Sequence, residues 1–100
     1  MYFILNNEYV FKTNKTIGES IKAIYTVFSA INSNSPLSKK ILDSIPFVKH
    51  KKLEPLYLTM YVSEIDTKEG MMFYDTSTRE LVVYHEKFTL KYNFNTLLYV

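Results

Sequence analysis

The spacing of apolar residues changes along the chain, and this change limits the possible folds more than any other feature. In the first third, apolar residues recur every three or four positions, at Ile17, Ile21, Ile24, Phe28 and Ile31. That period places them on one face of an α-helix. Later, aliphatic residues alternate with Tyr, Thr and Ser, at Leu56, Leu58, Met60 and Val62. Alternation indicates a half-buried strand, and separate helical and extended stretches predict an α+β domain.

The predicted first helix, residues 16–32, begins with a capping box. Thr16 is placed to accept a hydrogen bond from the third residue of the helix, and Glu19 to accept one in return. A second helix is predicted to begin at Ser35-Pro36, because serine is a favourable N-cap and proline loses no hydrogen bond at the first helical position. Its apolar stripe consists of Leu37, Ile41, Leu42 and Ile45. Pro46 is expected to end it.

Extended segments flank the helices on both sides. Residues 2–12 are predicted to be β structure, either a hairpin closed by Asn6-Asn7 or one long strand with a bulge. Further strands are predicted at 56–63, 71–75, 79–85, 88–92 and 96–100. Residues 47–54 are expected to be a connector.

These elements predict one domain, residues 1–100, in the order β(β)-α-α-β-β-β-β. Strands joined by short turns pair antiparallel, so we expect an antiparallel meander sheet of four to five strands with two helices packed on one face. The chain has no cysteine, so no disulfide supports this fold. Seven Phe and nine Tyr supply side chains for a core that must hold the domain by itself.

Positive charge is concentrated in the middle of the chain. Residues 36–53 carry a net charge of +4, whereas residues 54–100 carry −3. The lysines of this segment, called the basic island below, are Lys39, Lys40, Lys49, Lys51 and Lys52. Such a cluster attracts phosphate groups or an acidic partner.

The composition argues against several classes of enzyme. Two glycines cannot build a phosphate-binding or dinucleotide-binding loop. Two histidines, His50 and His85, in a chain without cysteine do not match the spacing of a metal site. The acidic residues after position 63 are expected to be solvated side chains near turns. We therefore predict no catalytic residues, no metal and no cofactor.

The start of the chain, Met1-Tyr2-Phe3-Ile4-Leu5, lacks the basic segment and the long apolar stretch of a signal peptide. No apolar run approaches the roughly 18 residues of a membrane span. The expected compartment is the cytoplasm.

We interpret the chain as a non-enzymatic module that binds another protein. Tyrosine is enriched at protein interfaces, and the predicted contact residues are the basic island together with Tyr57 and Tyr61. Phe, Ile, Lys, Asn and Tyr make up 42 of the 100 residues, which indicates an A/T-rich genome. This bias suits a phage or viral inhibitor of a host protein, and an edge strand leaves homodimerisation open.

Two alternative functions involve nucleic acid. The predicted order of helices and strands resembles that of the RelE-like toxins, and this resemblance covers most of the chain. It implies a small ribonuclease, whose candidate residues here are Lys49, Lys51, Lys52, Arg79 and His85. The other alternative is a nucleic-acid-binding module that uses the basic island for phosphates and Tyr57 and Tyr61 to stack on bases.

Overall fold

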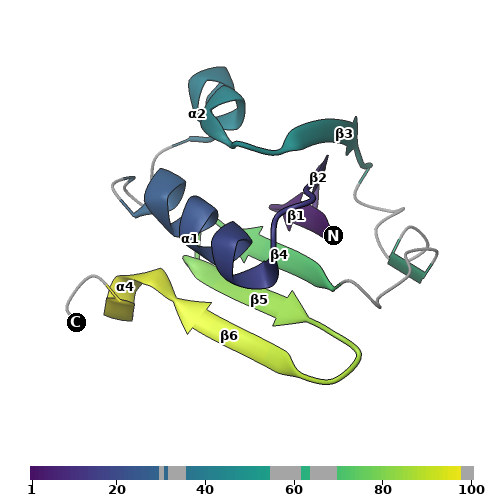
Figure 1. The fold of residues 1–100 in the computed structure, drawn as a ribbon. Helices are drawn as coiled ribbons and strands as arrows, with labels where there is room; N and C mark the ends of the chain where they lie inside the picture. The colour runs from purple at the N-terminus through teal and green to yellow at the C-terminus, as the bar shows by residue number, and fades with distance from the viewer. Residues whose placement is uncertain (30, 32–35, 55–61, 64–69, 98–100) are drawn as a thin grey trace.

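The computed structural model describes residues 1–29, 31, 36–54, 62–63 and 70–97. Figure 1 shows an α+β fold built on a six-stranded sheet with the strand order β3-β2-β1-β4-β5-β6. The predicted α+β class is therefore confirmed. The elements are β1 (Tyr2–Leu5), β2 (Tyr9–Lys12), α1 (Ile17–Phe28), α2 (Lys39–Ser44), β3 (Val48–Lys52), β4 (Met71–Asp75), β5 (Glu80–Tyr84), β6 (Thr89–Asn93) and α4 (Phe94–Leu97).

Of the two structures considered for residues 2–12, the hairpin is present and the single bulged strand is not. β1 pairs with β2 antiparallel, and Asn6 and Asn7 have φ angles of 53° and 56°. Asparagine adopts this left-handed region more readily than other side-chain-bearing residues. The N–H of Glu8 donates to the carbonyl of Leu5 at 3.0 Å and closes the turn.

The sheet itself differs from the predicted antiparallel meander of four to five strands. β1 pairs with β4 in parallel, from Tyr2 opposite Met71 to Leu5 opposite Tyr74, so the six-stranded sheet is mixed. The two strands are central, and three of the four residues of β1 are buried. Strands that are buried on both faces are typical of parallel pairs. The two strands of this pair are about 70 residues apart in the sequence. The predicted meander is present only in β4, β5 and β6, which pair antiparallel in sequence order.

The predicted connector at residues 47–54 is also wrong, because Val48–Lys52 forms β3. This strand pairs antiparallel with β2. All five of its residues are exposed, so no alternation of apolar and polar residues marks it in the sequence. The strand is defined by its backbone pairing alone.

The first helix begins as predicted but ends at Phe28 instead of near residue 32, and the second helix begins later than predicted. α1 starts after Thr16, whose side chain completes the capping box with Glu19, and ends at Phe28. α2 begins at Lys39 with Ser38 as its N-cap, not at Ser35-Pro36. Ser38 offers the same capping oxygen three residues further on, accepting a hydrogen bond of 3.2 Å from the N–H of Ile41. The helix ends as expected, with Ile45 extended before Pro46.

Two predicted strands lie largely outside the described residues. Of the strand at 56–63, residues 56–61 lie outside the described residues, and Val62 and Ser63 are helical. Of the strand at 96–100, residues 98–100 lie outside them, and Phe94–Leu97 forms α4. The N–H of Asn95 donates to Oδ1 of Asn93 at 2.9 Å, which turns the backbone at the end of β6.

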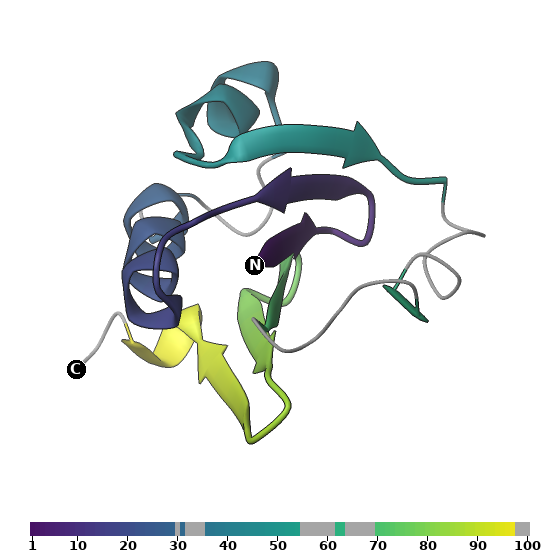
Figure 2. The ribbon, with the colours of Figure 1, turned by 45° about the vertical axis from the view of Figure 1, so that its right-hand side comes forward.

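The main core lies between α1 and one face of the sheet, with α2 at the β3 end (Figure 2). It contains Phe3, Leu5, Phe11, Met72, Tyr74, Leu81 and Val83 from the sheet, and Ile24, Phe28 and Phe94 from α1 and α4. Ile41 and Leu42 of α2 pack against the same cluster. A smaller cluster, Ile4, Val10 and Leu53, lies on the opposite face. None of the described helices is long and apolar enough to cross a membrane.

Candidate partner-binding surface

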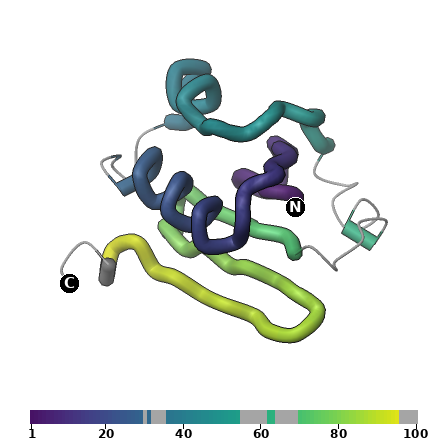
Figure 3. Tube along the Cα trace, in the orientation of Figure 1, coloured from purple at the N-terminus to yellow at the C-terminus, as the bar shows by residue number. Residues whose placement is uncertain are grey.

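β3 forms one end of the sheet and carries most of the basic island. Figure 3 shows the chain passing from α2 into β3 at the end of the molecule opposite β6. Val48 is 71% exposed, and Lys49, His50, Lys51 and Lys52 are exposed as well. Four basic or titratable side chains in succession therefore project from one strand at the sheet edge.

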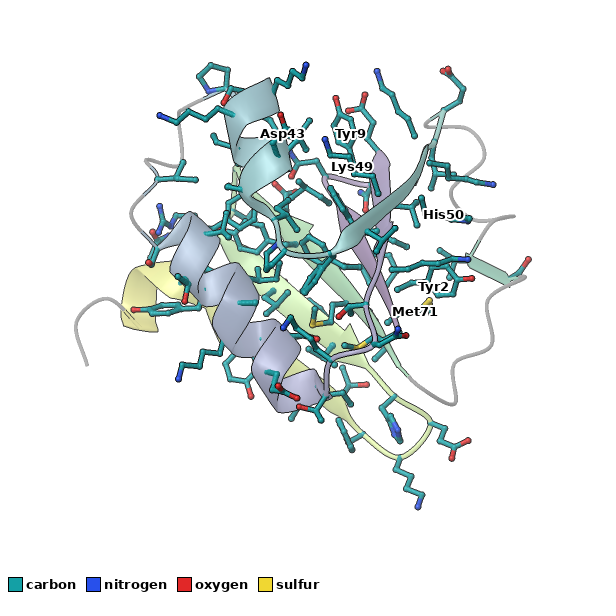
Figure 4. The ribbon with its side chains drawn as sticks, turned by 45° about the horizontal axis from the view of Figure 1, so that its top comes forward. Tyr2, Tyr9, Asp43, Lys49, His50 and Met71 are labelled. Atoms are coloured by element: carbon teal, nitrogen blue, oxygen red, sulfur yellow. The ribbon has the colours of Figure 1, made fainter. Side chains whose placement is uncertain are left out.

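A bulge divides these side chains between the two faces of the sheet. Val10 lies opposite Lys51 and Phe11 opposite Lys49, so His50 is the extra residue of β3. Such a bulge twists the strand and redirects its side chains. Figure 4 shows Lys49 on the side of Asp43 and Tyr9, and His50 on the opposite side with Tyr2.

On the α2 side, two lysines of β3 contact carboxylates. Lys49 forms an ion pair with Asp43, and this contact lowers the pKa of the Asp43 carboxyl. Lys52 Nζ lies 3.1 Å from Oε1 of Glu8 and 5.6 Å from the centre of the Tyr9 ring. The hydrogen bond with Glu8 raises the pKa of the Lys52 ammonium. This side of the strand thus already binds carboxylates of its own chain.

On the other side, the Tyr2 ring contacts the side chains of Lys12 and His50. Lys12 Nζ lies 5.4 Å from the centre of the Tyr2 ring. The His50 ring meets the Tyr2 ring in an edge-to-face arrangement, with 6.0 Å between the ring centres. Burial, Lys12 and Lys51 lower the pKa of His50. Sequence reasoning missed Tyr2 and Lys12, because only the pairing of β1, β2 and β3 brings them beside the basic island.

The remaining lysines of the basic island lie on α2. Lys39 and Lys40 are exposed residues of its first turn, where the helix dipole disfavours a positive charge. Lys39 nevertheless acts on Asp43, one turn along the same helix, where its charge helps to lower the pKa of the carboxyl. The Lys49–Asp43 ion pair links α2 to β3 and so joins both parts of the basic island into one surface.

Two hollows adjoin this surface. One, of about 290 Å³, lies between Leu42 of α2 and the paired strands β2 and β3. The other, of about 590 Å³, is lined by Lys12 and Lys15 on one side and Phe47 and Val48 on the other. The basic surface is therefore uneven and extends beyond the basic island to the loop before α1.

The predicted contact residues Tyr57 and Tyr61 lie outside the described residues. Of the other predicted contact residues, the five lysines of the basic island lie on one surface, and Lys12, Tyr2 and His50 lie beside them.

The structure separates the candidate residues of the ribonuclease alternative. Arg79 is 5% exposed and donates hydrogen bonds to backbone carbonyls at the end of α1. His85 follows the opposite end of β5 and stacks on Phe88 with ring centres 4.6 Å apart. β5 is four strands from β3 in the sheet, which corresponds to about 19 Å. Arg79, His85 and the β3 lysines do not form one site.

Among the described residues, no group of three or more His, Asp or Glu side chains is placed to hold a metal ion. In comparisons with known proteins, no family model matches the chain, and no curated protein or solved structure is significantly similar to it.

Proposed function

We propose that the protein is a non-enzymatic binding module that docks on an acidic region of another protein, as a small phage or viral inhibitor of a host protein would. The observation that supports this most directly is β3, an edge strand whose five residues are all exposed and include three lysines and a histidine. Lys39 and Lys40 extend the same charge onto α2.

The chemistry of the surface favours carboxylates over phosphates as its targets. Lys49 and Lys52 already contact the carboxylates of Asp43 and Glu8. Arginine is the side chain best suited to forked contacts with phosphate or guanine. The one arginine of the sequence, Arg79, is buried against α1 and does not reach the surface. An acidic polypeptide is therefore the partner that this surface fits best.

A charge-reversal experiment tests the proposal. The variant carries Lys49→Glu, Lys51→Glu and Lys52→Glu, and binding to fluorescent poly-L-glutamate is measured at low and moderate salt. The matched control reverses Lys22, Lys87 and Lys91, which are exposed lysines on other elements. Both variants change the net charge equally, and exposed charges of this kind affect stability by less than about 1 kcal/mol each.

We expect the β3 variant to lose at least tenfold in affinity for poly-L-glutamate and the control to lose about twofold or less. Equal losses would show that net charge governs binding, and the proposed surface would be wrong. Tighter binding to single-stranded RNA or duplex DNA in the same titration would favour the nucleic-acid-binding alternative. Cleavage of the RNA over time would favour the ribonuclease alternative.

A further inference from the structure

The outer edge of β3 offers backbone groups as well as charge. Within the described part of the chain, β3 pairs with β2 on one side and with no strand on the other. Every residue of β3 is exposed, so α2 does not cover the strand. An uncovered edge is a template for pairing with another extended chain.

The alternation of an antiparallel pair identifies one residue whose backbone faces outward. The N–H of Leu53 donates to the carbonyl of Glu8 at 2.6 Å, so Leu53 directs its backbone groups toward β2. Adjacent residues of a strand direct these groups to opposite sides. The N–H and C=O of Lys52 therefore point away from β2, toward an incoming strand.

Charge decides which kind of strand can pair here. A second copy of β3 would place lysines against lysines, and like charges opposite one another destabilise a sheet. An extended segment rich in Glu or Asp would instead place carboxylates opposite Lys49, Lys51 and Lys52. The charge of β3 therefore disfavours pairing with β3 of a second copy of the chain and favours pairing with an acidic strand.

We propose that β3 accepts an acidic, extended segment of another protein as an additional strand of the sheet, with the main chain pairing along the edge at Lys52 and the lysines binding its carboxylates. This inference rests on the proposed function and specifies its mode of docking. Main-chain hydrogen bonds would supply affinity, and the lysines would supply selectivity.

A pair of substitutions at one position separates strand addition from attraction by charge. Lys52→Pro removes the ammonium and the outward N–H, whereas Lys52→Gln removes the ammonium alone. Proline is tolerated in an edge strand where its nitrogen faces solvent. The probe is an acetylated, amidated peptide of about eight residues in which Glu alternates with Thr. We expect Lys52→Gln to weaken binding about threefold and Lys52→Pro at least tenfold; equal affinities for the two variants would overturn strand addition.

A second comparison uses the unaltered protein and so does not depend on how the proline variant folds. The same peptide is prepared with methyl groups on alternate backbone nitrogens, which keeps its charge and removes the N–H donors along one edge of the extended peptide. We expect the methylated peptide to bind at least tenfold more weakly. We also expect hydrogen exchange of the Lys52 amide to slow at least tenfold when the unmethylated peptide is bound. Equal binding of both peptides, or unchanged exchange of this amide in the complex, would overturn the inference.

The two proposals fail in different ways. If poly-L-glutamate binding depends on the β3 lysines but both peptides bind equally, the acidic-partner function stands and strand addition is wrong. If single-stranded RNA displaces the peptide and binds more tightly, the edge is a nucleic-acid site and both proposals are wrong. A homodimer that Lys52→Pro dissociates would assign the edge to a second copy of the chain and would also overturn strand addition.

Discussion

The guanidinium group of Arg79 lies against the C-terminal end of α1, where its Nη2 donates a hydrogen bond of 3.2 Å to the carbonyl of Phe28. The same nitrogen donates to the carbonyl of Ser29 at 3.2 Å, and Nη1 donates to the carbonyl of Ile31. The last carbonyls of a helix lack partners within the helix and attract a cation. Arg79 thus ties α1 to the turn between β4 and β5, where its backbone has a φ of 58°.

Replacing Arg79 with glycine keeps the left-handed backbone conformation accessible and removes the guanidinium hydrogen bonds. We expect the free energy of unfolding to fall by about 2–4 kcal/mol in urea denaturation followed by circular dichroism. Arg79→Lys is expected to recover part of this loss, because lysine keeps the charge but not the planar fork. A loss below about 1 kcal/mol for Arg79→Gly would contradict the stabilising role of this contact.

Ile24→Asp tests the buried face of α1. Ile24 is fully buried, so the substitution places an unpaired carboxylate in the core. We expect no cooperative thermal transition at neutral pH. The matched control is Lys22→Asp, which introduces the same side chain at an exposed position of the helix and should cost less than about 1 kcal/mol. A native-like melt for Ile24→Asp would show that the helix face is assigned wrongly.

The two asparagines of the β1–β2 turn are expected to respond differently to glycine. Asn6 donates from Nδ2 to Oγ1 of Thr76 at 3.0 Å, and its Oδ1 accepts from the Thr76 N–H at 2.9 Å. Asn6→Gly should therefore destabilise the protein by about 1–2 kcal/mol. Asn7 is exposed, and glycine suits its φ of 56°, so Asn7→Gly should leave stability within about 1 kcal/mol of the parent. Similar losses for both variants in urea denaturation would contradict the bridge between Asn6 and Thr76.

Alkaline unfolding is expected to report on Tyr74. Burial raises the pKa of Tyr74 to about 12, against about 10 in an unfolded chain. Between these two values the unfolded chain loses the proton while the folded chain keeps it. The stability contributed by neutral Tyr74 is therefore complete below pH 10 and falls as pH rises toward 12, by up to about 2–3 kcal/mol.

The measurement for Tyr74 is the free energy of unfolding from pH 8 to pH 12 for the parent and for Tyr74→Phe. Phenylalanine cannot ionise, so the variant should lose less stability than the parent above pH 10. Parallel curves for the two proteins would show that ionisation of Tyr74 does not limit alkaline stability.

Binding at β3 is expected to change the titration of His50. Burial, Lys12 and Lys51 lower the pKa of His50 in the free protein. Carboxylates brought to the edge should raise this pKa, so affinity for poly-L-glutamate should increase as pH falls through the titration. The measurement is the NMR titration of the His50 ring protons with and without poly-L-glutamate. Saturating polymer that leaves the His50 midpoint unchanged would place the bound carboxylates elsewhere.

Several parts of the fold depend on interactions between neighbours in the chain. The sequence predicts these parts. The capping box of Thr16 and Glu19 joins residues three apart, and the apolar stripe through Ile24 has the period of one helix. The turn at Asn6-Asn7 follows from the local preference of asparagine for positive φ angles, and the hydrogen bonds between Asn6 and Thr76 add to it. The concentration of lysines in β3 follows from their closeness in sequence.

Other features depend on pairing between distant segments. The parallel contact of β1 with β4 joins segments about 70 residues apart, which no local residue pattern identifies. Val48–Lys52 is a strand through backbone hydrogen bonds, which carry no residue pattern when a strand is wholly exposed. The same pairing places Tyr2 and Lys12 beside His50. Arg79 is a candidate residue of the ribonuclease alternative, and only the packing of α1 against the turn before β5 buries it.

Local chemistry in the sequence therefore determined the capped helix, the first hairpin, the C-terminal meander and the concentration of lysines in one segment. Tertiary structure alone decided that these lysines lie on a sheet edge, which residues join them, and which backbone groups face outward. The physical reason is that turn and helix preferences act over a few residues, whereas the order of strands in a sheet is set by burial and hydrogen bonding across the whole chain.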